Sequence, residues 1–307
     1  MFKIKIPTKS TYFTSEAVTH LQMVDEIFEF AMKCGSLIGG RILDINYKLS
    51  SKKVIFIMLM AISTCIINIF DLYLFRKDSV RSVFCLLTIS AQSQGFAKFY
   101  TFGCLRENIL NLRKQSEKFH EHFSSLKSSK IFEEKFMIVA HISAGLTILY
   151  ICTFILIAVY PIIYYFIMNE RILHFGLELP FIDWKDSWIG YGLNFIHQIF
   201  LVFIFLCFSI VTICIIICFM TSGMCQFDVL SLLLAELNEL ALSNEDGSKN
   251  NEIHQKVKFL IKTHVNLSEF LINLKQTFSV YFLIEFISLI FQKTVELFSI
   301  INVSFMK

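Results

Sequence analysis

The sequence predicts an all-α membrane protein, a polytopic helical bundle with long cytoplasmic helical extensions, in which residues 1–307 form a single transmembrane domain. Hydrophobic residues make up 55% of the chain, the mean hydropathy is +0.62, and 34 of 307 residues are Phe. A soluble domain of this length has no core large enough to bury so much apolar surface. Two stretches without Asp, Glu, Lys or Arg, Phe136–Asn169 and Ser187–Phe227, each exceed the roughly 20 residues with which a helix crosses a bilayer.

Five membrane spans follow from the hydropathy along the chain. The first contains a charge-free run from Val54 to Phe70, and Asp71 lies near its outer end. The second is the most polar, because a Gln-Ser-Gln triplet at 92–94 and Lys98 interrupt it. The predicted spans are residues 54–75, 82–104, 136–166, 190–220 and 277–305.

The distribution of Lys and Arg predicts the orientation. The segment before the first span holds 8 of these residues, the loop after the second 7 and the loop after the fourth 5, against 3 and 2 in the other two loops. Cytoplasmic loops keep Lys and Arg because these residues resist translocation. The N-terminus is therefore predicted to be cytoplasmic, which argues against a G-protein-coupled receptor.

The cytoplasmic segments are predicted to be helical. An amphipathic helix near the N-terminus is indicated by apolar residues at helical spacing, Val18, Leu21, Val24, Ile27, Phe28 and Ala31. Residues 106–135 alternate both signs of charge with apolar side chains, which favours helices projecting into the cytoplasm. Residues 226–276 contain two apolar seams typical of helices that pack on other helices. The second seam enters the fifth span without Pro or Gly, so one helix is expected to pass from cytoplasm to bilayer.

The outer loop from Asn169 to Asp186 is different in kind. It contains Pro180, the aromatic residues Phe175, Phe181 and Trp184, and an excess of acidic residues. This composition favours a structured lid packed over the outer ends of the bundle.

No enzymatic motif is present in the sequence. His120-Glu121-His122 is too short a pattern for a metal site, and we interpret it as a solvated helix face. Phosphate-binding, zinc-protease and nucleophile-elbow patterns are missing from the sequence, so we expect no catalytic residue, no cofactor and no metal. Nothing in the charge pattern suggests nucleic acid binding. The nine cysteines fall in spans or on the cytoplasmic side, which makes a disulfide framework unexpected.

Polar residues inside spans are costly and are therefore functional candidates. Lys98 lies near the inner end of the second span, and we expect its side chain to snorkel to the cytoplasmic headgroups. His141 is expected to be a hydrogen-bonded packing residue. Lys293 and Glu296 are three residues apart and are expected to pair on their own helix. Glu285 has no such neighbour, so it is predicted to face the bundle interior or another helix.

The outer halves of the spans have the composition of a small-molecule pocket. One face of the third span carries Thr153, Ile157, Tyr160 and Tyr164, and one face of the fourth carries Tyr191, Asn194, Gln198 and Leu201. Apolar and aromatic walls with a few hydrogen-bonding groups suit a volatile, mostly apolar ligand. The same stripes suit ordinary helix packing, and that alternative remains open. Pro161 is expected to kink the third span.

Several stretches resemble the insect odorant receptor family. Residues 179–184, Leu-Pro-Phe-Ile-Asp-Trp, resemble the lid before the fourth helix of that family, and residues 226–230, Gln-Phe-Asp-Val-Leu, resemble the cytoplasmic extension of the same helix. Residues 263–267, Thr-His-Val-Asn-Leu, followed by Phe278-Ser279 and by residues 282–286, Phe-Leu-Ile-Glu-Phe, are similar to the entry into its fifth helix. The order of these motifs and the inverted topology carry the resemblance over most of the chain.

The resemblance implies a seven-helix receptor that joins the odorant co-receptor, through its cytoplasmic helices, in a tetrameric ligand-gated cation channel of sensory neurons. A small hydrophobic odorant would bind in the outer half, where Phe84 and Thr88 of the second span are further candidates. The expected location is the plasma membrane, with the lipid bilayer around a multi-pass chain. Because five spans are found where the family has seven, we expect this chain to be a truncated product that does not conduct by itself.

Two alternatives remain open at this stage. A gustatory-type receptor has a similar topology, and its distinguishing signature lies in a seventh helix. A membrane transporter or scaffold is suggested by Lys98 and Glu285 inside spans. Transporters commonly show an internal repeat with broken helices at matching positions, whereas this sequence shows no repeat and has Pro161 as the one proline within a span.

Overall fold

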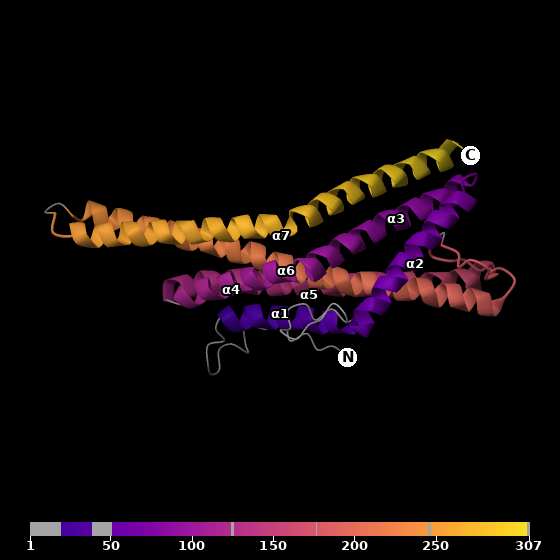
Figure 1. Cartoon of the computed structure of the whole chain (residues 1–307), viewed down its shortest axis with the longest axis horizontal. Helices are drawn as coiled ribbons and strands as arrows, with labels where there is room; N and C mark the ends of the chain where they lie inside the picture. Colours follow the sequence, from indigo (N-terminus) through magenta and orange to yellow (C-terminus); the bar gives the residue numbers. More distant parts are fainter. Residues whose placement is uncertain (1–19, 39–50, 124–125, 176, 245–246, 306–307) are drawn as a thin grey trace. The chain divides into compact units, whose positions relative to one another are not determined.

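The chain folds into a series of α-helices (Figure 1). The computed structural model describes residues 20–38, 51–123, 126–175, 177–244 and 247–305. Helices account for 88% of these residues, and no strand occurs among them. The elements are α1 (His20–Leu37), α2 (Lys52–Leu74), α3 (Ser79–Phe99), a π-helical segment (Tyr100–Cys104), α4 (Arg106–His122), α5 (Leu126–Met168), α6 (Trp188–Leu242) and α7 (Asn250–Phe305). The prediction of an all-α helical bundle is confirmed.

Four of these helices are long and apolar enough to cross a membrane within the described part of the chain. They are α2, α6, the part of α5 from Lys130 to Met168 and the part of α7 from Asn250 to Phe298. The second predicted span corresponds to α3 and the π-helical segment, whose polar residues keep it outside this group. The prediction that α7 continues from the second seam into the fifth span as one helix is confirmed. Val18, at the start of the predicted N-terminal helix, lies outside the described residues.

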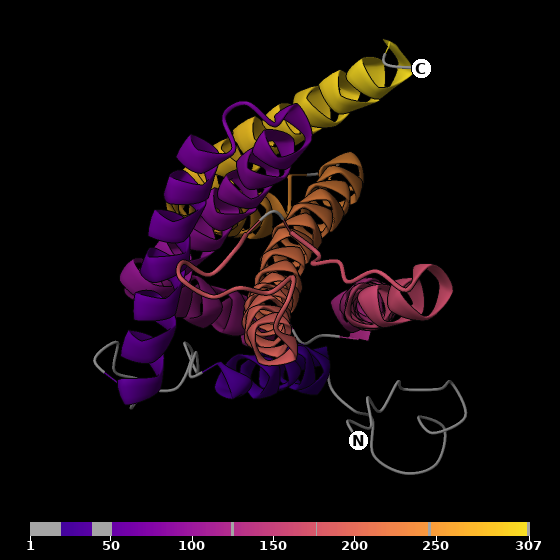
Figure 2. The same ribbon diagram turned by 90° about the vertical axis from the view of Figure 1, so that its right-hand side faces the viewer.

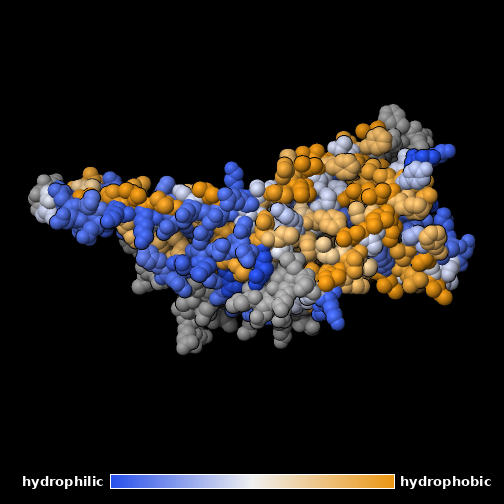
Figure 3. All heavy atoms as spheres, in the orientation of Figure 1, coloured by the Kyte–Doolittle hydropathy of each residue, from blue (hydrophilic) through white to orange (hydrophobic). Residues whose placement is uncertain are grey.

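The chain divides into two compact units, and α5, α6 and α7 each supply residues to both. Unit 1 comprises residues 1–31, 105–145 and 213–278, and unit 2 comprises residues 32–104, 146–212 and 279–307. Hydrophilic side chains cover much of the visible surface of unit 1, whereas hydrophobic side chains cover most of that of unit 2 (Figure 3). Exposed apolar residues such as Leu156 (70%) and Phe166 (80%) in unit 2 have the surface expected of helices in lipid.

In unit 2, α6 lies between α5 on one side and the pair of α2 and α3 on the other (Figure 2). The side chain of Ser51 caps α2 by accepting a hydrogen bond from Val54 N at 3.4 Å, and Asp78 caps α3 by accepting one from Arg81 N at 3.1 Å. The connection between α2 and α3, residues 75–78, is short, so the two helices pack as antiparallel neighbours. A buried cluster joins α2 to α6 through Ile57, Cys207 and Phe208.

Small residues bring α3 and α7 together within unit 2. Ser90 donates a hydrogen bond to the carbonyl of Ser288 at 3.2 Å, and the hydroxyls of Ser93 and Ser288 are 2.8 Å apart. Small polar residues of this kind stabilise helix pairs in lipid, because the hydrophobic effect does not drive helix association there. Ser93, one of the polar residues that interrupt the second predicted span, therefore contributes to its packing on α7.

The core of unit 1 is aromatic. The Phe219 ring lies 5.6 Å from Phe28 and 6.3 Å from Phe278, between centroids. His120 is fully buried, with its ring 4.6 Å from Phe132 and its Nε2 3.4 Å from the hydroxyl of Ser222. The interpretation of the His120 region as a solvated helix face was therefore wrong for His120, because the helical register turns this ring into the core. Groups of three or more potential metal ligands are absent from the described residues.

Candidate functional site

Two amide side chains of α6 hold the α5–α6 loop, residues 169–187. Asn194 accepts a hydrogen bond from Leu179 N at 2.7 Å and donates one to Gly190 O at 3.0 Å. The Oε1 atom of Gln198 accepts from His174 N at 3.0 Å and from Phe175 N at 3.3 Å, while its Nε2 donates to Leu177 O at 2.8 Å. Both side chains are fully buried. They share one helix face, as predicted, but they bind the loop backbone.

The same loop is tied to α2 and α3. Asp71, only 2% exposed, accepts a hydrogen bond from Glu178 N at 2.8 Å, and the Glu178 carboxylate lies 3.3 Å from Arg81. Arg81 also pairs with Asp78 at 3.4 Å. The prediction that this segment is structured is confirmed, since side chains of α2 and α6 satisfy its backbone and Arg81 of α3 pairs with its Glu178 side chain.

The loop approaches the first turn of α6 so closely that a glycine is required there. A Cβ at Gly190 would overlap the carbonyl oxygen of Asp183 and lie 2.7 Å from its carbonyl carbon. Phe181 adopts a positive φ of 65° and is fully exposed. The backbone therefore folds back on α6 at Asp183, which is the arrangement that lets Asn194 and Gln198 reach it.

An aromatic cluster, which consists of Tyr165, His174, Trp188, Tyr191 and Phe195, lies beside these amides. Ring centroids are 5.3 Å apart for Tyr165–Trp188, 6.2 Å for Trp188–Tyr191, 6.0 Å for the stacked Tyr191–Phe195 pair and 5.6 Å for Phe195–His174. The guanidinium of Arg171 covers Trp188 at 3.9 Å and donates to Lys185 O at 2.8 Å. Of this cluster, only Tyr191 was predicted from the sequence, although Trp188, Tyr191 and Phe195 are three and four residues apart and therefore lie on one helix face.

His174 brings a neutral polar atom into this cluster. Burial lowers the pKa of its imidazole from 6.5 to about 4, so the ring is uncharged at neutral pH. Its Nε2 is buried and has no hydrogen-bond partner among the described residues. The aromatic cluster thus combines apolar ring faces with one unused polar atom.

The predicted ligand-contact residues of α5 and α3 are more exposed than Asn194 and Gln198. The hydroxyl of Thr153 donates to Leu149 O at 2.9 Å on its own helix, and that of Thr88 donates to Phe84 O at 2.8 Å. Tyr160 is 55% exposed and its ring lies 6.2 Å from Tyr164. Further candidates are Ile157 and Leu201, which are half-buried, and Phe84, which is 42% exposed. A ligand contact for this set stays a prediction.

An ion pair joins the charged residues of the predicted spans. The Lys98 Nζ lies 2.9 Å from Glu285 Oε1, 3.3 Å from the hydroxyl of Ser209 and 4.4 Å from the centre of the Phe205 ring. Lys98 is only 4% exposed, so the expectation that it snorkels was wrong: a carboxylate on α7 provides its partner inside the bundle. Glu285 has no cationic neighbour one turn away on its own helix and finds its cation on α3.

The expected pairing of Lys293 with Glu296 holds, whereas His141 is hydrogen-bonded as expected but is not packed. Lys293 pairs with Glu296 at 2.8 Å on the exposed side of α7. His141 is exposed, and its Nδ1 lies 2.7 Å from Met137 O one helical turn earlier.

Comparison with known families identifies the class of protein. The family model described as 7tm Odorant receptor matches residues 83–306, which is most of the chain. The chain therefore belongs to the odorant receptor family, a family of multi-pass membrane receptors of olfaction. No curated protein matches the sequence. Of the possibilities left open by the sequence, the match supports the odorant receptor over the transporter or scaffold.

Proposed function

We propose that this chain is the odorant-recognising subunit of a ligand-gated cation channel formed with the odorant co-receptor. The observation that carries the proposal is membership of the odorant receptor family over residues 83–306. The site in unit 2 supports it, because a largely half-buried aromatic cluster suits a small hydrophobic odorant. The chain itself would supply ligand recognition.

The proposed ligand site comprises the aromatic cluster together with the predicted faces of α3, α5 and α6. Its ring faces offer dispersion contacts, and His174 Nε2 offers a single hydrogen bond. Since Asn194 and Gln198 already hold the loop, we assign them to positioning rather than to direct ligand contact.

Assembly with the co-receptor is proposed to use the unit 1 portions of α6 and α7. Apolar side chains on these portions are exposed, including Leu234 at 57%, Leu242 at 72% and Ile261 at 56%. Exposed apolar side chains along a polar surface are typical of interaction sites. The Lys and Arg distribution supports a cytoplasmic location for this unit and for the N-terminus, and membership of the odorant receptor family supports a plasma membrane location for the receptor.

Co-expression in oocytes tests the function. The receptor, expressed from its complete coding sequence with the co-receptor, is expected to give odorant-evoked cation currents. Silence across a broad odorant panel, with both subunits shown at the cell surface, would refute the proposal. Epitope tags give a second test, because an extracellular N-terminus contradicts the topology.

Interface variants test the assembly. Leu234→Arg combined with Leu242→Arg is expected to reduce co-precipitation with the co-receptor. Glu239→Arg, at an exposed polar position of the same helix, is the matched control and should leave it unchanged. Equal recovery of all three proteins would assign subunit contact to another surface.

A further inference from the structure

Unit 1 contains a cavity that the proposed odorant site does not use. It lies among α4, α6 and α7 and has a volume of about 610 Å³. Small-molecule sites in proteins commonly measure roughly 300–1,000 Å³. All of its lining residues belong to unit 1, whereas the aromatic cluster belongs to unit 2.

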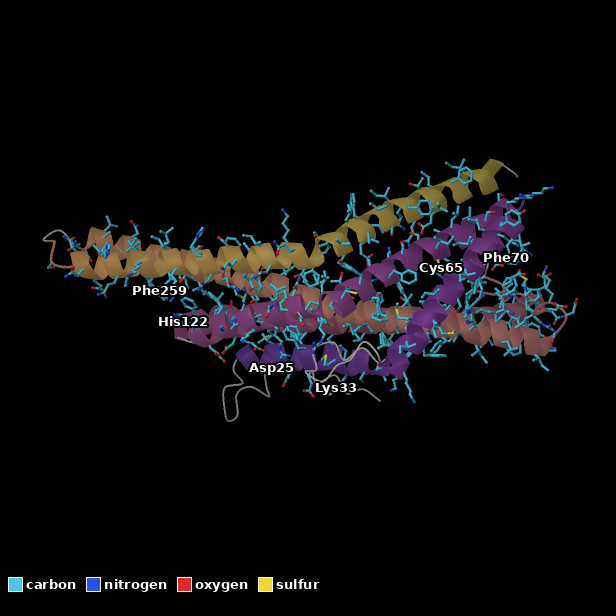
Figure 4. All side chains as sticks on the ribbon, viewed as in Figure 1. Asp25, Lys33, Cys65, Phe70, His122 and Phe259 are labelled. Carbon is cyan, nitrogen blue, oxygen red and sulfur yellow. The ribbon has the colours of Figure 1, made fainter. Side chains whose placement is uncertain are left out.

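One part of the cavity wall is aromatic. Phe119 and Phe123 of α4 lie 4.6 Å apart between ring centroids, and Phe123 lies 5.8 Å from Phe259 of α7. The His122 ring lies 5.7 Å from Phe259, and Figure 4 shows these two residues on neighbouring helices. These rings provide an apolar surface for a chain or ring of a ligand.

Another part of the wall presents hydrogen-bond donors. Gln226 of α6 is 2% exposed, and its Nε2 has no hydrogen-bond partner among the described residues. An unpaired buried donor is destabilising, so an acceptor bound in the cavity would relieve this cost. Lys118 and Lys262 also line the cavity, and neither forms an ion pair with any described residue.

The charges of the lining decide the class of ligand. Two lysines and one acidic residue, Glu269, leave a formal excess of a single positive charge when His122 is neutral. This balance favours one negative charge and disfavours a polyanion. Together with the aromatic wall, it selects a molecule that is apolar at one end and an acceptor at the other.

We propose that unit 1 binds an amphiphilic monoanion. Its head, a carboxylate or a phosphodiester, accepts hydrogen bonds from Gln226 and from the two lysines, and its apolar part lies against Phe119, Phe123 and Phe259. Such a molecule has two sources: a free fatty acid, or an anionic membrane lipid whose headgroup and first acyl carbons enter the cavity.

Photolabelling of the purified receptor tests the site. The probe is dodecanoate with a diazirine near the end of its chain, and we expect it to label α4 and α7 peptides that contain Phe123 and Phe259. Unlabelled dodecanoate should compete and dodecanol should not, since both have the same chain but only the acid carries charge. Competition by phosphatidylglycerol vesicles would identify a lipid source, and competition by dodecanoate alone would identify a free acid.

Substitutions separate binding from folding. Gln226→Leu and Lys262→Met are each expected to weaken dodecanoate binding about tenfold, because each removes a donor to a charged group. Lys258→Met, at an exposed position of α7 outside the cavity lining, is the control and should bind as the unmodified receptor does. Gln226→Leu replaces an unpaired buried amide with an apolar group, so it is expected to fold.

Four results would overturn the proposal. They are labelling confined to the exposed apolar helices of unit 2, equal competition by dodecanol, unchanged binding in both variants, and loss of labelling when the co-receptor is added. The last result would assign the cavity to subunit contact.

Discussion

Replacing Lys98 by Met removes one partner of the ion pair with Glu285 and leaves the carboxyl group without its cation. The Lys98 side chain is 6% exposed and that of Glu285 is 23% exposed, so little solvent compensates for the loss. Breaking a buried ion pair costs about 3–5 kcal/mol, and the partial exposure of Glu285 places the expected loss near the lower end, about 3 kcal/mol. Glu285→Leu is expected to cost at least as much, because it strands the more deeply buried Lys98.

The double variant Lys98→Met/Glu285→Leu removes both charges, and in lipid two apolar side chains need no polar partner. Its free energy of unfolding should lie within about 1 kcal/mol of the unmodified receptor. Unfolding of the purified proteins by SDS in mixed micelles measures all four free energies and gives the coupling between the two positions. Lys293→Met is the control, because that lysine is 68% exposed and a surface pair contributes about 0–1 kcal/mol. Additive losses, with coupling below about 0.5 kcal/mol, would refute the pairing of α3 with α7 through these residues.

Three further predictions concern the α5–α6 loop and its surroundings. Gly190→Ala should lower stability by about 1–3 kcal/mol, because the new methyl group meets the backbone of Asp183; thermal unfolding measures it. The contribution of His174 to stability should be constant above about pH 6.5 and fall as the pH drops from about 6.5 towards 4, because the unfolded imidazole takes up a proton that the folded ring, with its pKa lowered to about 4, does not; the difference in thermal unfolding between the unmodified receptor and His174→Phe across this range measures it. In a responding receptor, Tyr160→Ala or Asn194→Ala should raise the odorant concentration for half-maximal current by about tenfold, the first through a lost pocket wall and the second through a released loop.

Each of these predictions has a matched control. Gly192→Ala places a methyl group in open space, so its stability should not fall; equal losses for both glycines would contradict the close approach. His174→Phe keeps a ring beside Phe195 and should flatten the pH dependence, whereas an unchanged slope would assign it to other groups. Asn194→Asp keeps the acceptor for Leu179 N but loses the donor to Gly190 O, so it should restore sensitivity only in part.

The sequence predicted the helices far better than the side-chain contacts between them. Hydropathy and helical spacing are local properties, so they were sufficient to predict the long α7 and the shared face of Asn194 and Gln198. The pairing of Lys98 with Glu285 depends on how two helices almost two hundred residues apart are rotated against each other, which no local period encodes. The same reason explains His120, whose side of α4 is decided by Ser222 and Phe132.

The aromatic cluster was missed for another reason. Trp188 and Phe195 have helical spacing, but Tyr165 and His174 reach them only through the loop, whose course has no periodic signal. The course of the loop is determined by individual residues instead. Gly190 leaves space for the Asp183 backbone, and the buried side chains of Asp71, Asn194 and Gln198 accept hydrogen bonds from the loop.

Because the loop backbone occupies the hydrogen-bonding atoms of Asn194 and Gln198, polar recognition of an odorant bound beside them would rest on the Nε2 atom of His174. Discrimination would then depend on shape, at about 0.8 kcal/mol for each buried methylene, so neighbouring homologues would differ in potency by only a few fold. Such a receptor is broadly tuned. Its preferences can also be altered by exchanging one apolar side chain for another, with the hydrogen-bonded scaffold left intact.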